Sequence, residues 1–310
     1  MPSFTDAVAN GIPVLTDGGI ETRVMFETSI TMNPEIQVAG LVGDPKGEPA
    51  LRAIYQSYLD AASSTGVPVV IGTPTFRASV NFTRLAGLGD VEAVQRLNSA
   101  AVAFHRQLLD GHTGPPAWIG GVLGPAGDAY RPAEAPSATA AAEYHRAQIE
   151  SLAEAGVDFL FAATFPAVGE AIGVARAMAR TGLPFVVSWV LDADTRVLDG
   201  TALAEAIHRV DDEAAPTYFS LSCIHPTVAA RALDRCGEAV SRIREVKANG
   251  SRLSPAELVA LDHAESDPPG EFATAMDYLR RNYDVPVVGG CCGTTDAHMR
   301  ALGELLPTHG

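Results

Sequence analysis

The strongest constraint on the fold of this chain is a repeated alternation of short apolar runs and helix-length segments. Each apolar run is rich in β-branched residues, and Gly or Pro usually separates it from the Ala-rich stretch that follows. Seven of the eight runs are almost continuously apolar, which is typical of parallel strands covered on both faces; the charged run 239–246 fits least well. The runs predict strands over residues 12–17, 67–72, 117–123, 158–164, 184–190, 218–223, 239–246 and 285–290.

The segments between these runs carry helical patterns. Eight strand–helix alternations predict an α/β fold, a (β/α)8 TIM barrel, with a doubly wound parallel sheet as the second choice. We expect one barrel domain over residues 1–310, because no segment has the composition of a linker. The long loops 22–49 and 125–137 would lie at the C-terminal rim, where such barrels carry their sites. The predicted helices cover residues 50–64, 90–110, 139–155, 168–181, 201–213, 226–236, 254–263 with 268–282, and 296–305.

Composition excludes some classes of partner. The chain has a formal net charge of −15, which disfavours binding to nucleic acid through its phosphates. No apolar run approaches the length of about 20 residues that a membrane span needs. The N-terminus lacks the pattern of a signal peptide, and with only four cysteines we expect reduced thiols in a cytoplasmic protein. The oligomeric state is left open, a homo-oligomer included.

Three of the four cysteines follow predicted strands. Cys223 ends the strand 218–223, and Cys291 and Cys292 directly follow the strand 285–290. In a barrel these positions share the C-terminal rim, so the three thiols can converge on one point, and the neighbouring glycines let the backbone turn sharply. Three thiolates with an open fourth position are typical of a reactive zinc site.

Other interpretations of the cysteines stay open at this point. The three thiols could be buried structural groups, and Cys291 and Cys292 could form a strained vicinal disulfide. His225, two residues after Cys223, is a less favoured fourth ligand. Cys236, near the end of a predicted helix, is interpreted as a structural thiol.

The chain also resembles a known family. GGCCGT preceded by a strand-end cysteine is a specific signature, whereas DGG or GTP alone would be weak. The motifs resemble those of the homocysteine S-methyltransferase family, zinc-dependent barrels that methylate thiols, and they occur in the family's order. They are TDGGIET (16–22), GTPTFRAS (72–79), GGVLGPAGDAYRP (120–132), EAGVDFLFAATFP (154–166), LSCIHP (221–226) and GGCCGTTDAHM (289–299).

The resemblance implies a cofactor, a reaction and a set of site residues. It places Zn2+ on Cys223, Cys291 and Cys292, where coordination would deprotonate a substrate thiol that is a poor nucleophile at neutral pH. The activated thiolate then attacks the methyl group of a small donor, without a separate protein base. The partners are a small-molecule thiol, homocysteine first, giving methionine, and a donor similar to S-methylmethionine. The residues predicted to bind substrate are Asp17, Gly18, Glu21, Thr75, Arg77, Thr164 and Ser222.

Three positions depart from the family pattern. Family members usually carry a glutamate that binds the amino group of homocysteine where this chain has Ala163. They usually have Asn where Ser222 stands, and a neutral or aromatic residue near the donor where Arg77 stands. Either Glu21 replaces the missing acid, or the acceptor is another thiol, or the donor carries an anionic group that meets Arg77.

These departures keep two alternatives to the main function open. One is a zinc-dependent methyltransferase or demethylase on the same barrel that uses a different thiol acceptor or an anionic methyl donor. The other is a non-catalytic barrel that binds zinc or thiols, although a site without turnover would have no need of all three cysteines. S-methylmethionine is favoured as donor because its carboxylate can pair with Arg77, whereas a purely cationic donor would be repelled.

Overall fold

Eight parallel strands form a closed barrel in sequence order, with β1 next to both β2 and β8. The computed structural model describes residues 2–253, 257–258 and 261–307. The predicted TIM barrel is confirmed, and the doubly wound sheet is wrong because β8 pairs with β1 and leaves no open edge. The strands are β1 (Val14–Thr16), β2 (Val69–Gly72), β3 (Ala117–Leu123), β4 (Phe159–Phe165), β5 (Phe185–Trp189), β6 (Tyr218–Ser222), β7 (Ile243–Ala248) and β8 (Val287–Gly290).

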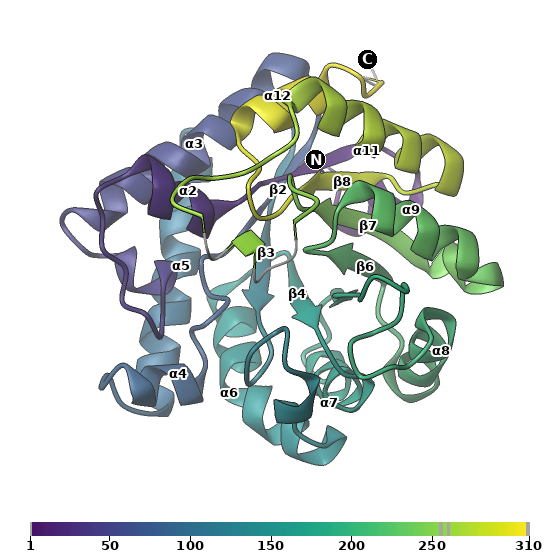
Figure 1. Ribbon diagram of the computed structural model, residues 1–310. Helices are drawn as coiled ribbons and strands as arrows, with labels where there is room; N and C mark the ends of the chain where they lie inside the picture. Colours follow the sequence, from purple (N-terminus) through teal and green to yellow (C-terminus); the bar gives the residue numbers. More distant parts are fainter. Residues whose placement is uncertain (1, 254–256, 259–260, 308–310) are drawn as a thin grey trace.

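The major helices surround the strands, as Figure 1 shows. They match the predicted helices within three residues at each end, except for the predicted helix 254–263. Half of that segment, residues 254–256 and 259–260, lies outside the described residues; residues 257–258 are helical, and residues 261–263 are not. The helices are α3 (Gly47–Thr65), α5 (Val91–Asp110), α6 (Ala138–Ala155), α7 (Val168–Ala179), α8 (Leu203–Ala214), α9 (Pro226–Arg235), α11 (Pro269–Tyr283) and α12 (Asp296–Gly303).

The weakest predicted strand is wrong at its start. Residues 237–242 form the 3-10 helix η3, and β7 begins only at Ile243. Gly237 takes a φ of +59°, and the Arg242 guanidinium pairs with Asp211 at 2.8 Å, so the chain turns before it enters the sheet. The strand also runs two residues further than predicted, because Lys247 and Ala248 pair with β8.

Short helices occur where the sequence predicted loops or nothing. The loop 22–49 contains most of α2 (Ile20–Glu27) and the 3-10 helix η1 (Val38–Leu41), and the loop 125–137 contains η2 (Pro132–Glu134). Two further short helices, α1 (Phe4–Ala9) and α4 (Val80–Leu85), were not predicted. The six residues of α1 and the six of α4 span fewer than two helical turns, too few for helical periodicity to mark them.

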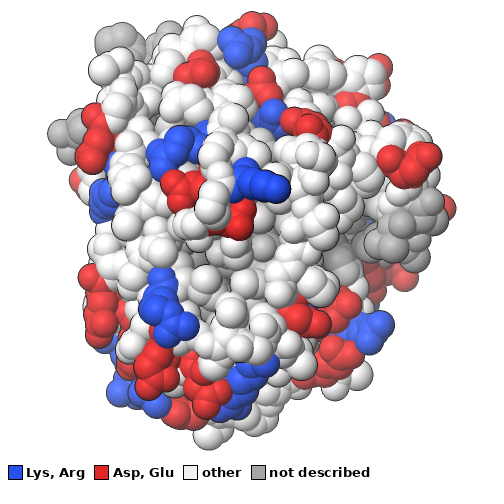
Figure 2. Space-filling view, turned by 90° about the vertical axis from the view of Figure 1, so that its left-hand side faces the viewer, with Lys and Arg blue, Asp and Glu red and all other residues white. Residues whose placement is uncertain are grey.

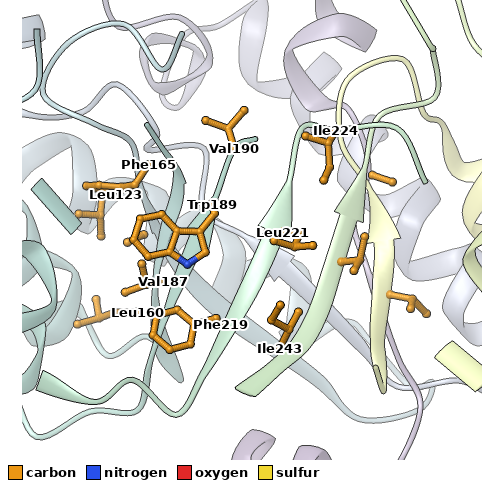
Figure 3. Packing of buried hydrophobic residues seen from close by; sticks show 14 of the residues in the cluster. Leu123, Leu160, Phe165, Val187, Trp189, Val190, Phe219, Leu221, Ile224 and Ile243 are labelled. Atoms are coloured by element: carbon orange, nitrogen blue, oxygen red, sulfur yellow. The ribbon is translucent and has the colours of Figure 1, made fainter. Parts of the chain in front are cut away.

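Side chains of alternate strand residues lie in two separate apolar cores. The outer core lies between the strands and the helices, and Figure 3 shows Leu160, Val187, Trp189 and Phe219 packed within it. The inner core fills the barrel and includes Phe161, the neighbour of Leu160 that points to the opposite face.

Helix α1 closes the N-terminal end of the barrel interior. Phe4 stacks on Phe159, with ring centroids 4.0 Å apart, and meets the edge of Trp118 at 5.7 Å. The helix is fixed by a capping box in which the Ser3 hydroxyl accepts from the Asp6 N–H and the Asp6 carboxylate accepts from the Ser3 N–H. The far, C-terminal end of the interior is therefore the end available for chemistry.

The surface is mixed in charge. On the face shown in Figure 2, basic side chains lie among acidic ones and no broad basic patch appears. Arg52 and Glu48 on α3 form one such surface pair, 2.9 Å apart. Within the described ranges, no helix combines the length and hydrophobicity that a bilayer crossing requires.

Candidate metal centre

Three thiols converge at the C-terminal rim. Cys223 directly follows β6, Cys291 and Cys292 directly follow β8, and β7 lies between these two strands. The three Sγ atoms all lie within 4.8 Å of one another. Among the described residues this is the one cluster of three or more side chains able to hold a metal ion. We call it the cysteine cluster. All three cysteines are free thiols and half-buried, so neither a vicinal disulfide nor deep burial describes them.

Backbone hydrogen bonds hold these cysteines in place. Cys223 takes a φ of +55°, its N–H donates to the Lys247 carbonyl at 3.1 Å, and its own carbonyl accepts from the Asn249 amide at 3.0 Å. The Cys291 carbonyl accepts from the Thr294 hydroxyl at 2.7 Å. A left-handed backbone at a non-glycine residue costs free energy and persists only where its surroundings enforce it. The cluster is thus built by the fold before any ligand arrives.

The glycines after β1 allow close packing against the cysteine loop. A Cβ on Gly19 would lie 2.7 Å from the Cys291 carbonyl oxygen, and one on Gly18 would lie 2.6 Å from the Tyr58 hydroxyl. Gly18, predicted to bind substrate, therefore lies where the chain after β1 packs against α3. Its substrate contact stays a prediction.

The thiols do not ionise independently. Hydrogen bonds from Cys223 and Cys292 lower the pKa of the Cys291 thiol, and its hydrogen bond to Cys291 raises the pKa of Cys223. One thiolate therefore forms readily and is shared by its neighbours. Soft sulfur donors in a set of three, partly accessible and outside any disulfide, fit zinc as a ligand set.

Cys236 contrasts with the cysteine cluster. It is 3% exposed, lies in the outer core, and burial raises the pKa of its thiol to about 11. This placement agrees with the interpretation of Cys236 as a structural thiol.

Asp17 is already paired inside the barrel. One carboxylate oxygen accepts from the Gly72 N–H at 2.7 Å, and the other accepts from the Lys247 ammonium at 2.5 Å. Burial lowers the pKa of Lys247, but the carboxylates of Asp17 and Glu245 outweigh it, so the pKa is raised and the amine stays charged. The sequence reasoning missed Lys247. It lies one residue beyond the predicted strand 239–246, so the charges of that run gave no signal for it.

Glu21 lies in the first turn of α2 within the electrostatic field of the cluster. Burial raises the pKa of its carboxyl to about 7, and the charges of Cys291 and Asp17 add to the effect. Within the described residues, the only hydrogen-bond partner of this carboxylate is its own backbone N–H. Glu21 is therefore a half-buried acid beside the thiols that forms no ion pair with a described residue, although the Lys247 charge lowers its pKa somewhat.

Three further candidates use their hydroxyls inside the protein. Thr75 donates to the Val122 carbonyl at 2.6 Å, Ser222 pairs with Ser188 at 2.6 Å, and Thr164, with a φ of +57°, donates to the Ala163 carbonyl at 2.7 Å. All three are buried, and their contacts with substrate stay predictions.

Arg77 lies between two loops. Its guanidinium stacks over the Phe82 ring at 4.6 Å and donates to the Pro34 carbonyl at 3.4 Å, while its buried Nε has no partner among the described atoms. These contacts are with loop and helix residues rather than with Asp17 or the cysteine cluster. A role toward the donor stays a prediction.

Two other rim residues are clarified by the structure. Both ring nitrogens of His225 are engaged, one accepting from the Thr227 N–H at 3.2 Å and the other 2.9 Å from Asp267, which rules against His225 as a fourth ligand.

Tyr130, on the loop after β3, lies near all three thiols. Loss of hydration at its hydroxyl and the charges of the three thiols raise the pKa of Tyr130. The motif that contains Tyr130 was recognised, but the tyrosine was not assigned to the site.

Comparison with known proteins identifies the family. The model of the homocysteine S-methyltransferase family matches residues 14–306, almost the whole chain. The chain belongs to the homocysteine S-methyltransferase family. It is therefore a methyltransferase by family, rather than a non-catalytic barrel.

Solved structures agree in fold. The oxidized form of the homocysteine methyltransferase MmuM from Escherichia coli has a TM-score of 0.75 and 20% identity, covering 94% of this chain and 95% of that one. The metallated form of the same enzyme has a TM-score of 0.74 and 21% identity, covering 94% and 96%. None of the curated proteins matches the chain in sequence. At this identity the likeness shows the fold alone.

Proposed function

We propose that this protein is a zinc-dependent S-methyltransferase that moves a methyl group from a small donor to homocysteine and forms methionine. The observation that carries the proposal is the cysteine cluster, whose three Sγ atoms lie within 4.8 Å of one another at the rim of a barrel of this family. Free thiols at the site fit a reducing compartment, so we place the reaction in the cytoplasm.

Cys223, Cys291 and Cys292 would hold the metal. Zinc bound there would supply deprotonation of the acceptor thiol near neutral pH. The acceptor sulfur attacks the donor methyl carbon, and the bond from that carbon to the donor's leaving atom breaks with its electron pair. The remaining task of the chain is to bind both substrates in line, which removes much of the entropic cost of a bimolecular transfer.

Glu21 takes the place of the missing family acid in this proposal. Ala163 lies in the inner core with its methyl group inside the barrel and cannot pair with an ammonium. The Glu21 carboxylate lies in the field of Cys291, and no cation among the described residues forms an ion pair with it. An ammonium on the acceptor would provide that cation.

The donor is proposed to be S-methylmethionine or a similar sulfonium with its own carboxylate. Arg77 has a guanidinium whose Nε lacks a partner, and a guanidinium binds a carboxylate through paired hydrogen bonds. The same charge would repel a donor that is only cationic.

The first experiment joins metal content to turnover. Wild type, Cys292→Ser and Cys236→Ser would be loaded with zinc under reducing conditions and assayed for methionine formation from homocysteine and S-methylmethionine. We expect one zinc ion per chain in wild type and in the Cys236→Ser control. Cys292→Ser should lose the zinc and at least about a hundredfold in rate, because the ligand set is broken. Absence of zinc from reduced wild type would contradict the proposal.

A second experiment tests whether Glu21 replaces the family glutamate that is missing at Ala163. Glu21→Gln should raise the KM for homocysteine about tenfold or more, since it removes a charge-assisted contact with the ammonium. Adding Ala163→Glu to this variant should lower the KM again by restoring an acid inside the barrel. No effect of Glu21→Gln on KM would remove Glu21 from the acceptor site.

A different thiol acceptor is the second candidate, and Ala163 is the residue that favours it. Zinc-loaded protein that methylates thiols without an α-amino group, and forms no methionine, would select this candidate.

A further inference from the structure

A lysine is directed into the barrel immediately below the cysteine cluster. In the sheet, Lys247 pairs with Ser222 of β6 on one side and with Gly289 of β8 on the other. Cys223 comes one residue after Ser222, and Cys291 two residues after Gly289. Lys247 therefore lies on the one strand between the two that carry the thiols, a single step deeper in the barrel. Its ammonium contacts Asp17 and lies 6.0 Å from the Phe161 ring of the inner core.

This ammonium retains unused hydrogen-bonding capacity. A lysine has three N–H donors, and among the described residues only Asp17 accepts from Lys247. The Lys247 side chain is 15% exposed, whereas that of Asp17 is 4% exposed. The ammonium thus has N–H donors without a partner among the described residues, on a side chain that is more accessible than that of Asp17.

A purely structural explanation of the pair is weak. An interior ion pair loses so much hydration that apolar residues often stabilise a fold as well or better. The charge of Lys247 is balanced by Asp17, with the carboxyls of Glu245 and Glu21 in the same field. Keeping charge at this level of the barrel is better explained by a ligand that carries charge itself.

We propose that Lys247 is a specificity residue that binds the carboxylate of the thiol acceptor. The acceptor is then an α-amino-acid thiol, with its sulfur at the cysteine cluster, its carboxylate at Lys247 and its ammonium at Glu21. Because it enters as a zwitterion, its ammonium offsets the acids around Lys247 while its carboxylate meets the lysine. This inference rests on the proposed function, since it takes the cluster as the place of the acceptor sulfur.

The test measures acceptor binding without methyl transfer. Calorimetry on zinc-loaded protein, with no donor present, would compare homocysteine with 3-aminopropane-1-thiol, which lacks the carboxylate, and with 4-mercaptobutyrate, which lacks the ammonium. Lys247→Met should weaken binding of both carboxylate-bearing thiols by about ten- to a hundredfold and change that of 3-aminopropane-1-thiol by less than about twofold. Lys247→Arg should retain part of the affinity, because it keeps the charge with a different shape.

A double variant controls for the destabilising effect of an unpaired buried charge. Lys247→Met leaves the buried Asp17 charge without a partner, so the combination of Asp17→Asn with Lys247→Met removes both charges together. Zinc content of each variant should equal that of wild type. The combination should show the same selective loss for carboxylate-bearing thiols.

The outcomes separate this inference from the proposed function. Equal weakening of all three thiols in both variants, with zinc retained, would make Lys247 a structural residue and overturn the inference. Wild type that binds none of the three thiols would also overturn it. Selective loss in the variants, combined with a wild type that transfers no methyl group, would support the acceptor site while removing the proposed methyltransferase activity.

Discussion

The two ends of the barrel interior are made by the same strands and have opposite character. At the N-terminal end, Phe4 from α1 stacks on Phe159 and closes the interior with aromatic rings. At the C-terminal end, Lys247 and Asp17 form an ion pair directly below the thiols. In this chain, as in TIM barrels generally, the residues that stabilise the barrel and the residues of the candidate site lie at opposite ends of one axis.

A buried hydrogen bond between Tyr218 and Glu245 lies where the aromatic end of the barrel interior meets the charged end. The Tyr218 hydroxyl, whose ring belongs to the inner core, donates to the Glu245 carboxylate at 3.0 Å. Glu245 is two residues below Lys247 on the same strand. Polar groups thus reach the middle of the barrel, and the following variants test how sharply the two ends are divided.

The largest effect on stability is expected at the closed end. Phe4→Ala should lower the free energy of unfolding by about 3–5 kcal/mol, because it leaves a cavity beneath Phe159. Urea denaturation measures this loss, and the folded variant should still bind one zinc ion per chain. Loss of zinc from the folded variant would show that the two ends are coupled.

At the open end, Gly19→Ala should weaken zinc binding by about ten- to a hundredfold. The new Cβ would lie 2.7 Å from the Cys291 carbonyl, so the cysteine loop has to move, and displaced supports of metal ligands cost affinity on this scale. A competition titration with a zinc chelator measures the affinity. The control is Gly270→Ala, where a Cβ has open space and the backbone is unstrained. Equal affinities in the two variants would contradict the prediction.

The boundary should respond to pH through Glu245, because burial raises the pKa of its carboxyl from 4.5 to about 7. The folded protein then holds this proton more tightly than the unfolded chain, so folding stability is lost as pH rises from about 4.5 to about 7. Glu245→Gln removes this dependence. Relative to the variant, metal-free wild type should lose about 1–3 kcal/mol across this range, measured by urea unfolding at each pH. If the difference in unfolding free energy between wild type and Glu245→Gln does not change with pH, the pKa of Glu245 is not raised.

The smallest effect is expected from Tyr218→Phe. The change removes one buried hydrogen bond and keeps the ring, so the free energy of unfolding should fall by about 1–2 kcal/mol. Thermal or urea unfolding measures it, with Tyr278→Phe on the exposed surface as the control. A loss of unfolding free energy as large as that of Phe4→Ala would mean that the Tyr218–Glu245 hydrogen bond contributes to stability as much as the aromatic packing does.

The fold could be predicted from the sequence largely because the outer core imposes a simple pattern. Strands buried on both faces must be apolar at every position, so seven of them stood out and were placed within two residues. The start of β7 was missed because Arg242 and Arg244 interrupt that pattern near its N-terminal end. Helix α1 was missed because its six residues act through contacts with strands distant in the chain.

The site could be predicted only in part. The cysteines were recognisable because each follows a strand, and parallel strands share one rim. Lys247 was not, because its partner Asp17 is 230 positions away and only barrel closure brings β7 close to the end of β1. The placement of Arg77 against Phe82 likewise depends on loop packing, for which the sequence carries no periodic signal.

The strand order has a consequence for when the proposed metal site can form during synthesis. The thiols come from the ends of β6 and β8, and β8 is the last strand to leave the ribosome. The aromatic contacts of Phe4 need only strands up to β6, so they can form on the nascent chain before the cysteines meet. Capture of the proposed zinc ion by all three thiols would therefore be a late event in synthesis, possible only after the final strand has joined the barrel.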